Sequence, residues 1–309
     1  MKSDQAVLEI EGISKRYGSR VALDEMEFSV GAGEIFGFVG GNGAGKTTTM
    51  RIIIGVLEKD AGAVRWSGRP LDAKTRTSFG YMPEERGLYP RMTVGNHLQY
   101  LARLHGMDRH AARTAMHTWT ERLDIGQHRD RAVDSLSLGN QQRVQLAAAL
   151  VHDPRFLLLD EPFSGLDPLA VDTMSSVLRS KADEGVPVLF SSHQLDLVER
   201  LCDRVGIASK GTMVACGTVE ELRAGADNSV YIEVDDAPDD WPASIPGADD
   251  LPAHRRGAGI VLGLPHGFDE NRLLHHAMRL GRVVAFHRQR PSLTELFRSA
   301  VTDEPQEAA

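Results

Sequence analysis

The stretch that decides the fold, residues 34–48, reads EIFGFVGGNGAGKTT. Its first six residues form an apolar run that predicts a buried strand, and the loop that follows has the spacing G-x-x-x-x-G-K-[ST]. Glycines let backbone N–H groups approach a phosphate without obstruction from Cβ atoms, and a helix beginning near Lys46 directs its positive dipole end at the same charge. The stretch therefore predicts a strand, a phosphate-binding loop and a helix, in that order.

The loop also predicts which residues contact a nucleotide. Lys46 supplies a positive charge for the β- and γ-phosphates and is expected to assist catalysis, and the hydroxyl of Thr47 is placed to ligate Mg²⁺. The residues expected to bind the phosphates are Gly40, Gly41, Asn42, Gly43, Ala44, Gly45, Lys46, Thr47 and Thr48.

A second apolar strand, residues 155–159, ends in the carboxylates Asp160 and Glu161. Two carboxylates at the tip of a buried strand are unusual, and a role at a phosphate-binding site would explain them. We expect Asp160 to hold Mg²⁺, directly or through water, and Glu161 to act as the general base that polarises the attacking water.

Short apolar strands alternate with helical stretches before residue 225, as in an α/β fold with a largely parallel sheet. The strands expected in this part are residues 34–39, 156–159 and 186–190, and residues 93–123 carry helical signals without a clear strand. Residues 229–234, 259–264 and 282–286 predict further strands, and residues 269–280 and 292–301 predict helices. We therefore expect a small α+β domain to follow a boundary near Gly225.

Composition and charge narrow the class of protein. The chain has 309 residues and a net charge of −8, and residues 225–309 alone carry −6 of it. An acidic chain argues against a surface built to neutralise nucleic-acid phosphates. The segment DDAPDDWPASIPGADD, residues 235–250, predicts an exposed acidic loop. Cys202 and Cys216 cannot form a disulfide framework, and we expect two reduced thiols.

Between the phosphate loop and Asp160 lies LSLGNQQR, residues 136–143, in which Ser137 precedes Asp160 by 23 residues. Here the chain resembles the ATP-binding subunits of ABC transporters, whose signature reads L-S-G-G-Q and precedes the carboxylate strand by a similar distance. The resemblance covers most of residues 6–224. It implies a P-loop cassette with a largely parallel sheet, antiparallel N-terminal strands and a helical insert at about residues 85–135.

The resemblance also implies roles for residues that would be unremarkable alone. Tyr17, in KRYG at residues 15–18, matches the aromatic residue that stacks on adenine. His193 matches the switch histidine that contacts the γ-phosphate, and Asp167, in SGLD at residues 164–167, belongs to the loop through which two subunits communicate. Without the resemblance, Tyr17 would be taken as a packing residue and His193 as an ordinary polar residue at a strand end.

In the family, the signature faces the γ-phosphate held by a second copy of the subunit, so that ATP lies between two chains. Ser137, Gly139 and Asn140 are the signature residues implied to bind nucleotide here. Leu138 and Asn140 stand where the family pattern has Gly and Gln. One subunit alone is then expected to be a poor ATPase, and closure of the dimer on ATP supplies the free energy for movement.

The segment GYMPEERGLYP, residues 80–90, also departs from the family pattern. Glu84 aligns with a Gln that senses Mg²⁺ and the γ-phosphate and couples to the membrane partner. A carboxylate there can ligate Mg²⁺ and adds negative charge beside the phosphates. The same segment, and PSLTELF at residues 291–297, resemble a subgroup of bacterial drug and sodium exporters with a C-terminal accessory domain.

The resemblance implies an ATP-hydrolysing subunit with ATP and Mg²⁺ as cofactors. Its partners would be a second cassette and a separate integral membrane permease, and nucleic acid is not expected. The chain would be cytoplasmic and peripheral on the inner face of the cell membrane. The expected domains are a cassette at residues 1–224 and an accessory domain at residues 225–309. Two alternatives remain open: a soluble ABC-type ATPase acting on ribosomes or DNA, and a weakly hydrolysing regulatory module.

Overall fold

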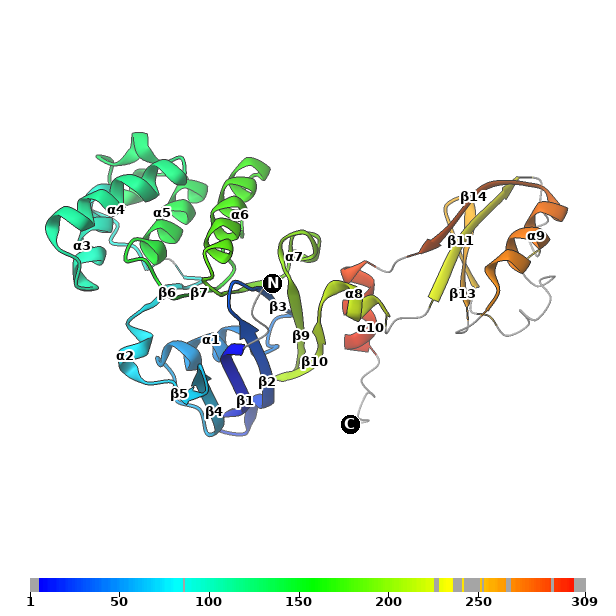
Figure 1. Ribbon diagram of the computed structural model, residues 1–309, viewed down its shortest axis with the longest axis horizontal. Coiled ribbons are helices and arrows are strands. Elements are labelled where there is room, and N and C mark those ends of the chain that lie inside the picture. Colours follow the sequence, from blue (N-terminus) through cyan, green and yellow to red (C-terminus); the bar gives the residue numbers. More distant parts are fainter. Residues whose placement is uncertain are drawn as a thin grey trace. The chain divides into compact units, whose positions relative to one another are not determined.

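The computed structural model describes residues 6–85, 87–224, 228–235, 241, 251, 253–264, 268–289 and 292–302. The chain divides into two compact units, one built mainly by residues 1–219 and the other by residues 220–298. Figure 1 shows both units, with most of their helices and strands labelled. The predicted boundary residue Gly225 and most of the predicted acidic loop, residues 236–240 and 242–250, lie outside the described residues. The domain boundary at residue 225 therefore stays a prediction.

A central sheet of six strands organises the first unit, in the order β10-β9-β3-β8-β7-β6. Neighbouring strands from β9 to β6 run parallel, and β10 pairs antiparallel with β9. The sheet has the largely parallel character that the sequence predicts. Its strands are β3 (Ile35–Gly40), β6 (Phe79–Met82), β7 (Phe156–Leu159), β8 (Val188–Ser192), β9 (Arg204–Ser209) and β10 (Thr212–Gly217).

The inner strands are buried along their whole length because helices cover parallel strands on both faces. Every residue of β3, β7 and β8 is buried, and helices α1, α6 and α7 pack against β3. Strand β8 begins two residues later than predicted. Pro187 has no N–H to donate to a sheet, and the Val186 N–H bonds instead to the Lys181 carbonyl.

The second sheet of this unit is antiparallel, in the order β2-β1-β4-β5. It confirms the antiparallel N-terminal strands that the resemblance implies. Strand β2 buries residues at a spacing close to two along its second half, as expected for a sheet with one face toward the core. The strands are β1 (Ala6–Tyr17), β2 (Arg20–Gly31), β4 (Ala61–Trp66) and β5 (Arg69–Pro70).

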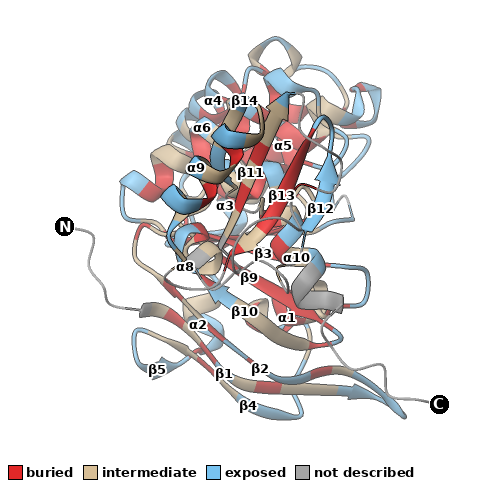
Figure 2. Cartoon of the chain, turned by 90° about the vertical axis from the view of Figure 1, so that its right-hand side faces the viewer, coloured by how far each residue is buried: buried red, intermediate tan, exposed pale blue. Residues whose placement is uncertain are grey.

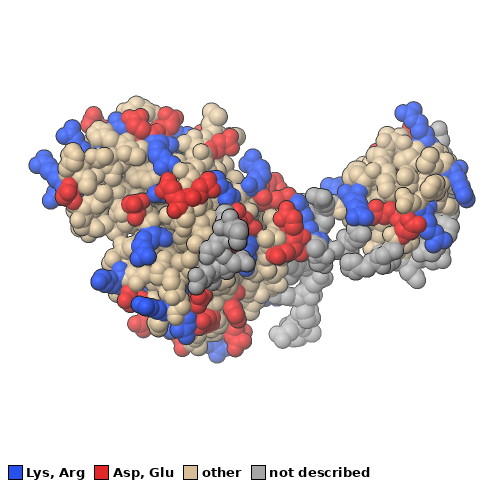
Figure 3. All heavy atoms as spheres, in the orientation of Figure 1, with Lys and Arg blue, Asp and Glu red and all other residues tan. Residues whose placement is uncertain are grey.

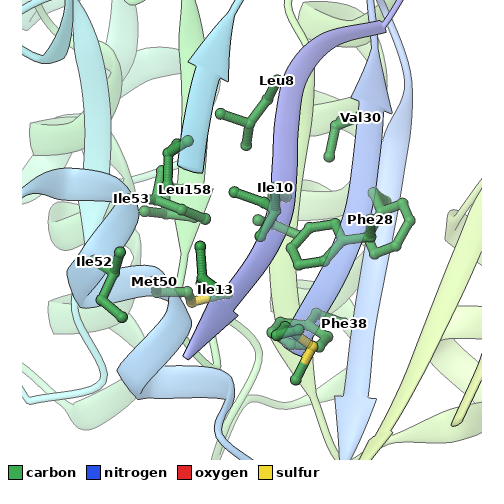
Figure 4. Packing of buried hydrophobic residues seen from close by; sticks show 14 of the residues in the cluster. Leu8, Ile10, Ile13, Phe28, Val30, Phe38, Met50, Ile52, Ile53 and Leu158 are labelled. Atoms are coloured by element: carbon green, nitrogen blue, oxygen red, sulfur yellow. The ribbon is translucent and has the colours of Figure 1, made fainter. Parts of the chain in front are cut away.

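The main core lies between this antiparallel sheet, helix α1 (Lys46–Ile54) and the central sheet. Figure 4 shows Ile10 and Phe28 of the antiparallel sheet pointing toward side chains of α1 and of the central sheet, Met50 and Phe38 among them. This packing fixes α1, and with it the phosphate loop that precedes α1.

Helices α3 and α4 lie within the predicted helical insert, and α3, α4 and α5 contact one another. Side-chain caps begin them: the Thr93 hydroxyl, the Asp108 carboxylate and the Ser137 hydroxyl each accept a backbone N–H of the first turn. The helices of the first unit are α1, α2 (Ala73–Arg76), α3 (Val94–Leu104), α4 (Arg109–Arg122), α5 (Leu138–Leu150), α6 (Pro168–Asp183) and α7 (Leu195–Leu201). Two short 3₁₀ turns, Gly126–His128 and Val133–Ser135, lie between α4 and α5.

The second unit is the expected α+β module, a four-stranded antiparallel sheet in the order β12-β13-β11-β14 with α9 on it. Strand β12 was not predicted, because its four residues are all exposed and carry no apolar alternation (Figure 2). Ser292 and Glu295 form a capping box at the start of α10. The elements are α8 (Val219–Ala224), β11 (Asn228–Asp235), β12 (Ala253–Arg256), β13 (Gly259–Leu264), α9 (Glu270–Leu280), β14 (Arg282–Gln289) and α10 (Leu293–Thr302).

On the face of the molecule drawn in Figure 3, basic and acidic side chains are interspersed. Neither Cys202 nor Cys216 forms a disulfide, and burial raises the pKa of Cys202 well above its usual range. None of the helices in the described part of the chain combines the length and the apolar character that crossing a membrane requires.

Candidate active site

Three neighbouring parallel strands end at one edge of the central sheet and bring the predicted residues together. Strand β8 lies between β3 and β7 and runs parallel to both. The loop after β3 carries Gly41–Gly45, the residues after β7 are Asp160 and Glu161, and His193 follows β8. Carboxyl ends of neighbouring parallel strands meet at the same edge, which is where ligands bind in open α/β sheets.

The phosphate loop adopts a conformation that requires glycine. Gly45 has a φ of 94°, and a Cβ atom at this position would lie 2.4 Å from Leu23 Cδ2. The Lys46 ammonium donates to the carbonyl oxygens of Gly40, at 2.7 Å, and Gly41, at 3.3 Å, so its charge lies over the loop. The loop and its lysine are therefore arranged around one position for an anion.

The hairpin of β1 and β2 lies against this loop. A Cβ atom at Gly45 would approach the Ala22 carbonyl oxygen to 3.0 Å, and one at Gly43 would lie 3.5 Å from Arg20 Nη2. Tyr17 ends β1, directly before the turn to Arg20, and its ring is 51% exposed. The structure thus places an accessible aromatic ring on the hairpin that borders the phosphate loop.

Asp160 is buried at the tip of β7, where a single hydroxyl holds it. The Ser191 hydroxyl donates to Asp160 Oδ1 at 2.6 Å and accepts the Glu161 backbone N–H at 2.8 Å. Asp160 is 1% exposed, and its Oδ2 makes no hydrogen bond with any described group. A buried carboxylate oxygen without a partner fits a ligand that is absent from the structure, such as a cation or its bound water.

Glu161 has a φ of 51°, a left-handed conformation that is uncommon for residues other than glycine. Gln142 of α5 donates to the carbonyl oxygens of Glu161 and Pro162, at 3.2 and 3.1 Å, and stabilises this turn. The Glu161 Oε2 atom lies 2.9 Å from His193 Nδ1. The two predicted catalytic side chains are therefore in direct contact.

Glu84 follows β6 and its side chain is exposed. Burial raises the pKa of the neighbouring Tyr81, and the negative charges of Asp160 and Glu84 raise it further against the opposing charge of Arg51. Both carboxylates are thus close enough to Tyr81 to act on its hydroxyl. The structure brings Glu84 to the same edge of the sheet as Asp160.

The signature residues lie at the N-terminus of α5, where the Ser137 hydroxyl accepts the Asn140 N–H at 3.4 Å. A Cβ atom at Gly139 would lie 3.5 Å from Leu166 Cδ2, next to Asp167, whose carboxylate caps α6 by accepting the Ala170 N–H at 2.8 Å. In the described part of the chain, no hydrogen bond joins Ser137 or Asn140 to the phosphate loop. The signature and the segment of Asp167 form a second cluster.

The oxygen donors at the sheet edge suit Mg²⁺, which prefers carboxylate, hydroxyl and phosphate oxygens and keeps several waters. Thr47 and Asp160 supply such oxygens, and Asp160 Oδ2 makes no hydrogen bond within the described residues. Within the same residues, no group of three or more His, Cys, Asp or Glu side chains is placed to hold a metal ion by itself. The site therefore fits an ion held jointly by a few protein oxygens and by phosphate.

Ser191 and Gln142 organise the site and were not predicted as site residues. Ser191 and Ser192 end a buried strand whose first three residues are apolar, and these hydroxyls were the signal available in the sequence. Gln142 lies on α5, far along the chain from Glu161, so only the fold could connect them. Both act by positioning the two carboxylates rather than by touching substrate.

A glycine-rich loop with its lysine after β3 and a carboxylate pair at the tip of β7 define a P-loop ATPase with an inserted helical segment. The model of the ABC transporter family matches residues 23–164, and that of the ATP-binding protein DrrA1-3-like C-terminal domain matches residues 217–301. The chain belongs to the ATP-binding subunits of ABC transporters. It is an ATP-binding ATPase of that family, with a DrrA-like C-terminal domain as its sequence indicated.

Three curated relatives, all ATP-binding proteins by name, match most of this chain. The ABC transporter ATP-binding protein YhaQ of Bacillus subtilis is 42% identical over 74% of this chain and 78% of its own length. The linearmycin resistance ATP-binding protein LnrL of B. subtilis is 32% identical (74% and 75%), and the Nod factor export ATP-binding protein I of Burkholderia orbicola is 37% identical (70% and 72%).

Solved structures share the fold of the cassette. A structure of an ATP-binding subunit of an ABC transporter has a TM-score of 0.66 and 31% identity, covering 71% of this chain and 95% of that one. The dimeric cassette MJ0796 has a TM-score of 0.64 over 68% and 98% of the two chains, and at 21% identity it shows the fold alone.

Proposed function

We propose that this chain hydrolyses ATP to power the export of a substrate through a separate integral membrane permease, and that two cassettes close on ATP held between them. The observation that carries the proposal is the contact between Glu161 and His193 at the sheet edge that also holds the phosphate loop. The names of the relatives, linearmycin resistance and Nod factor export, favour export over import.

The chemistry assigned to the site follows from its charges. Glu161 acts as general base toward a water molecule, and His193 orients that water and the γ-phosphate. Lys46 and the backbone N–H groups of residues 40–48 neutralise the phosphates, and Tyr17 stacks on the base. Thr47 and Asp160, with Glu84 nearby, would hold Mg²⁺, and the ion would supply positive charge for the transferred phosphoryl group.

The sandwich arrangement is supported by the exposure of the signature. Ser137 and Leu138 are exposed, and α5 directs its N-terminal dipole outward at this point, as an anion-binding helix must. Ser137, Gly139 and Asn140 bind the γ-phosphate of the second cassette, and Asp167 lies at the contact between cassettes. A chain that cannot form the dimer then binds ATP but hydrolyses it slowly.

Glu161→Gln tests the general base. The change removes a proton acceptor and keeps the shape of the side chain, so we expect unchanged ATP affinity, a steady-state turnover lower by about 100-fold or more, and an ATP-bound dimer on size-exclusion chromatography. Glu58→Gln, at an exposed glutamate outside the sheet edge, is the matched control. Turnover of the Glu161→Gln protein equal to that of this control refutes the assignment.

Purification from detergent-solubilised membranes tests the permease. We expect a membrane protein with several apolar segments of about 20 residues to accompany the chain, which would be peripheral on the cytoplasmic face. Accompaniment by ribosomes or nucleic acid instead contradicts the proposal and favours a soluble ATPase. In this proposal residues 1–224 are the cassette, with its insert at about residues 85–135, and residues 225–309 are the accessory domain.

A further inference from the structure

Asn140, in the signature at the start of α5, has a side-chain partner outside its own helix. Its amide nitrogen Nδ2 lies 3.2 Å from Nε2 of His128, which belongs to the 3₁₀ turn between α4 and α5. Both side chains are half-buried. Among the described residues, neither side chain makes any other hydrogen bond. The turn therefore contacts the part of α5 that is proposed to bind nucleotide.

The position of Asn140 within α5 makes this partner unexpected. Ser137 is the N-cap of α5, so Asn140 is the third residue of the helix. A polar side chain at that position can complete a capping box by reaching back to the backbone N–H of the N-cap. The Asn140 amide is instead directed at His128, 12 residues earlier in the chain. The contact with His128 thus decides where the amide points.

The chemistry of the amide fixes the proton on the His128 ring. An amide nitrogen only donates, so Nε2 accepts and the neutral ring carries its proton on Nδ1. The amide nitrogen of Asn140 has two hydrogens, and the contact uses one of them. The second hydrogen and Oδ1 stay available to a ligand. His128 therefore orients the Asn140 side chain and leaves its binding capacity in place.

The segment that carries His128 is fixed to α3 and α4. The Gly95 N–H donates to the Arg129 carbonyl oxygen at 2.9 Å, and the Val94 N–H donates to the Arg131 carbonyl oxygen at 3.0 Å. The Arg129 Nε atom donates to the hydroxyl of Thr120, in α4, at 2.7 Å. The signature is thus bonded to a segment that both helices hold.

We propose that His128 is a positioning residue of the signature. By holding the Asn140 amide, His128 preorganises this side chain for the nucleotide on a second cassette and links its position to α3 and α4. Preorganisation strengthens binding because less side-chain freedom is lost. The inference rests on the proposed function, since it requires two cassettes that close on ATP. It goes beyond that function by assigning a role to a residue outside the motifs.

Two variants separate the hydrogen bond from the packing of the ring. His128→Gln keeps an acceptor near the position of Nε2, and His128→Leu removes the acceptor. Closure of two cassettes is measured as the dependence of ATP turnover on protein concentration. We expect His128→Leu to raise the protein concentration at half-maximal turnover about five- to tenfold, and His128→Gln to keep it within about twofold of the unaltered chain. The ATP affinity of the dilute chain in EDTA should be unchanged in both, because the phosphate loop belongs to the other cluster.

Asn140→Ala tests whether His128 acts through Asn140. In the Asn140→Ala protein, the further change His128→Leu should have no additional effect, because two residues that act through one contact are not additive. His117→Leu, at an exposed histidine of α4, is the matched control and should behave as the unaltered chain. Additive effects of the two changes, or equal losses in His128→Leu and His128→Gln, overturn the inference.

Nitrogen NMR of labelled histidine rings tests the contact itself, because it shows which ring nitrogen carries the proton. At about pH 8, where an ordinary histidine is neutral, we expect the proton of His128 on Nδ1 in the full chain without nucleotide. The ring should change its tautomer in the Asn140→Ala protein. A proton on Nε2 in both proteins overturns the inference.

The turnover measurements keep the two proposals apart. Turnover per chain that does not depend on protein concentration in the unaltered protein refutes the proposed dimer, and the role of His128 with it. A concentration dependence that is present and that His128→Leu leaves unchanged refutes the role of His128 alone.

Discussion

Replacing Ser191 with alanine tests whether one hydroxyl organises the carboxylate pair. The change removes the donor to Asp160 Oδ1 and the acceptor of the Glu161 N–H. Asp160 is then left with both carboxylate oxygens unpartnered by described groups in a site that is 1% exposed, and Glu161 loses a bond that supports its left-handed backbone.

The two hydrogen bonds of the Ser191 hydroxyl determine how much stability the variant should lose. A hydrogen bond to a charged group contributes about 1.5–3 kcal/mol and one between neutral groups about 0.5–1.5 kcal/mol. Ser191→Ala should therefore lower the free energy of unfolding by about 2–4 kcal/mol. Ser192→Ala is the matched control, since Ser192 is also buried at the end of β8 and its hydroxyl, among the described residues, accepts only the Gln194 N–H, in a bond of 3.0 Å. Its expected cost is about 1 kcal/mol.

Urea unfolding followed by tryptophan fluorescence measures the difference between the two variants, and steady-state hydrolysis with Mg²⁺ measures the functional effect. Because the phosphate loop follows β3, ATP binding in EDTA should be unchanged in the Ser191→Ala protein while turnover falls. If Ser191→Ala and Ser192→Ala lose equal stability and both retain turnover, Ser191 has no positioning role and the reasoning fails.

Three further outcomes are expected. Lys46→Ala should weaken ATP binding at least tenfold, measured by equilibrium titration, because the charge over the phosphate loop is lost. Tyr17→Ala should weaken it by about tenfold if the ring stacks on the base, whereas equal weakening of inorganic triphosphate would contradict stacking. Burial lowers the pKa of His97 to about 4 in the folded chain against about 6.5 when unfolded, so the unfolded state binds more protons in between and stability falls as pH drops through this window. Between pH 7 and pH 5, His97 is expected to lower the free energy of unfolding by roughly 2 kcal/mol. Thermal unfolding at the two pH values measures this loss, and the His97→Phe protein should lack the part that His97 contributes.

The parts of the fold predicted from the sequence are those with a strong local pattern. The apolar runs of β3 and β7 were identified to within a residue, because a strand buried on both faces has no polar interruption. Strand β12 was missed because its residues, AHRR, owe their conformation to pairing with β13. The start of β8 was placed too early because Val186 continues the apolar run, although Pro187 cannot join the ladder.

The site residues also fall into two groups, those that a local sequence pattern predicts and those that it does not. The phosphate loop, Asp160 and Glu161 follow strands directly, and the topology of a parallel sheet brings them together. The partners that fix their geometry come from other elements: Ser191 from β8 and Gln142 from α5. No local pattern links residues that are 19 to 31 positions apart along the chain.

The conformation of Glu161 depends on contacts from other elements as well as on its own motif. The proposed general base follows a buried strand and has a positive φ of 51°, and a conformation of that kind persists only when surrounding bonds over-determine it. Ser191 bonds to the Glu161 N–H and Gln142 bonds to its carbonyl oxygen, so the peptide groups on both sides of the residue are held. Gln142 belongs to the helix that the signature begins. In the proposed dimer, a displacement of α5 on closure would act directly on the backbone of Glu161 through this bond, which would give closure a physical means of controlling hydrolysis.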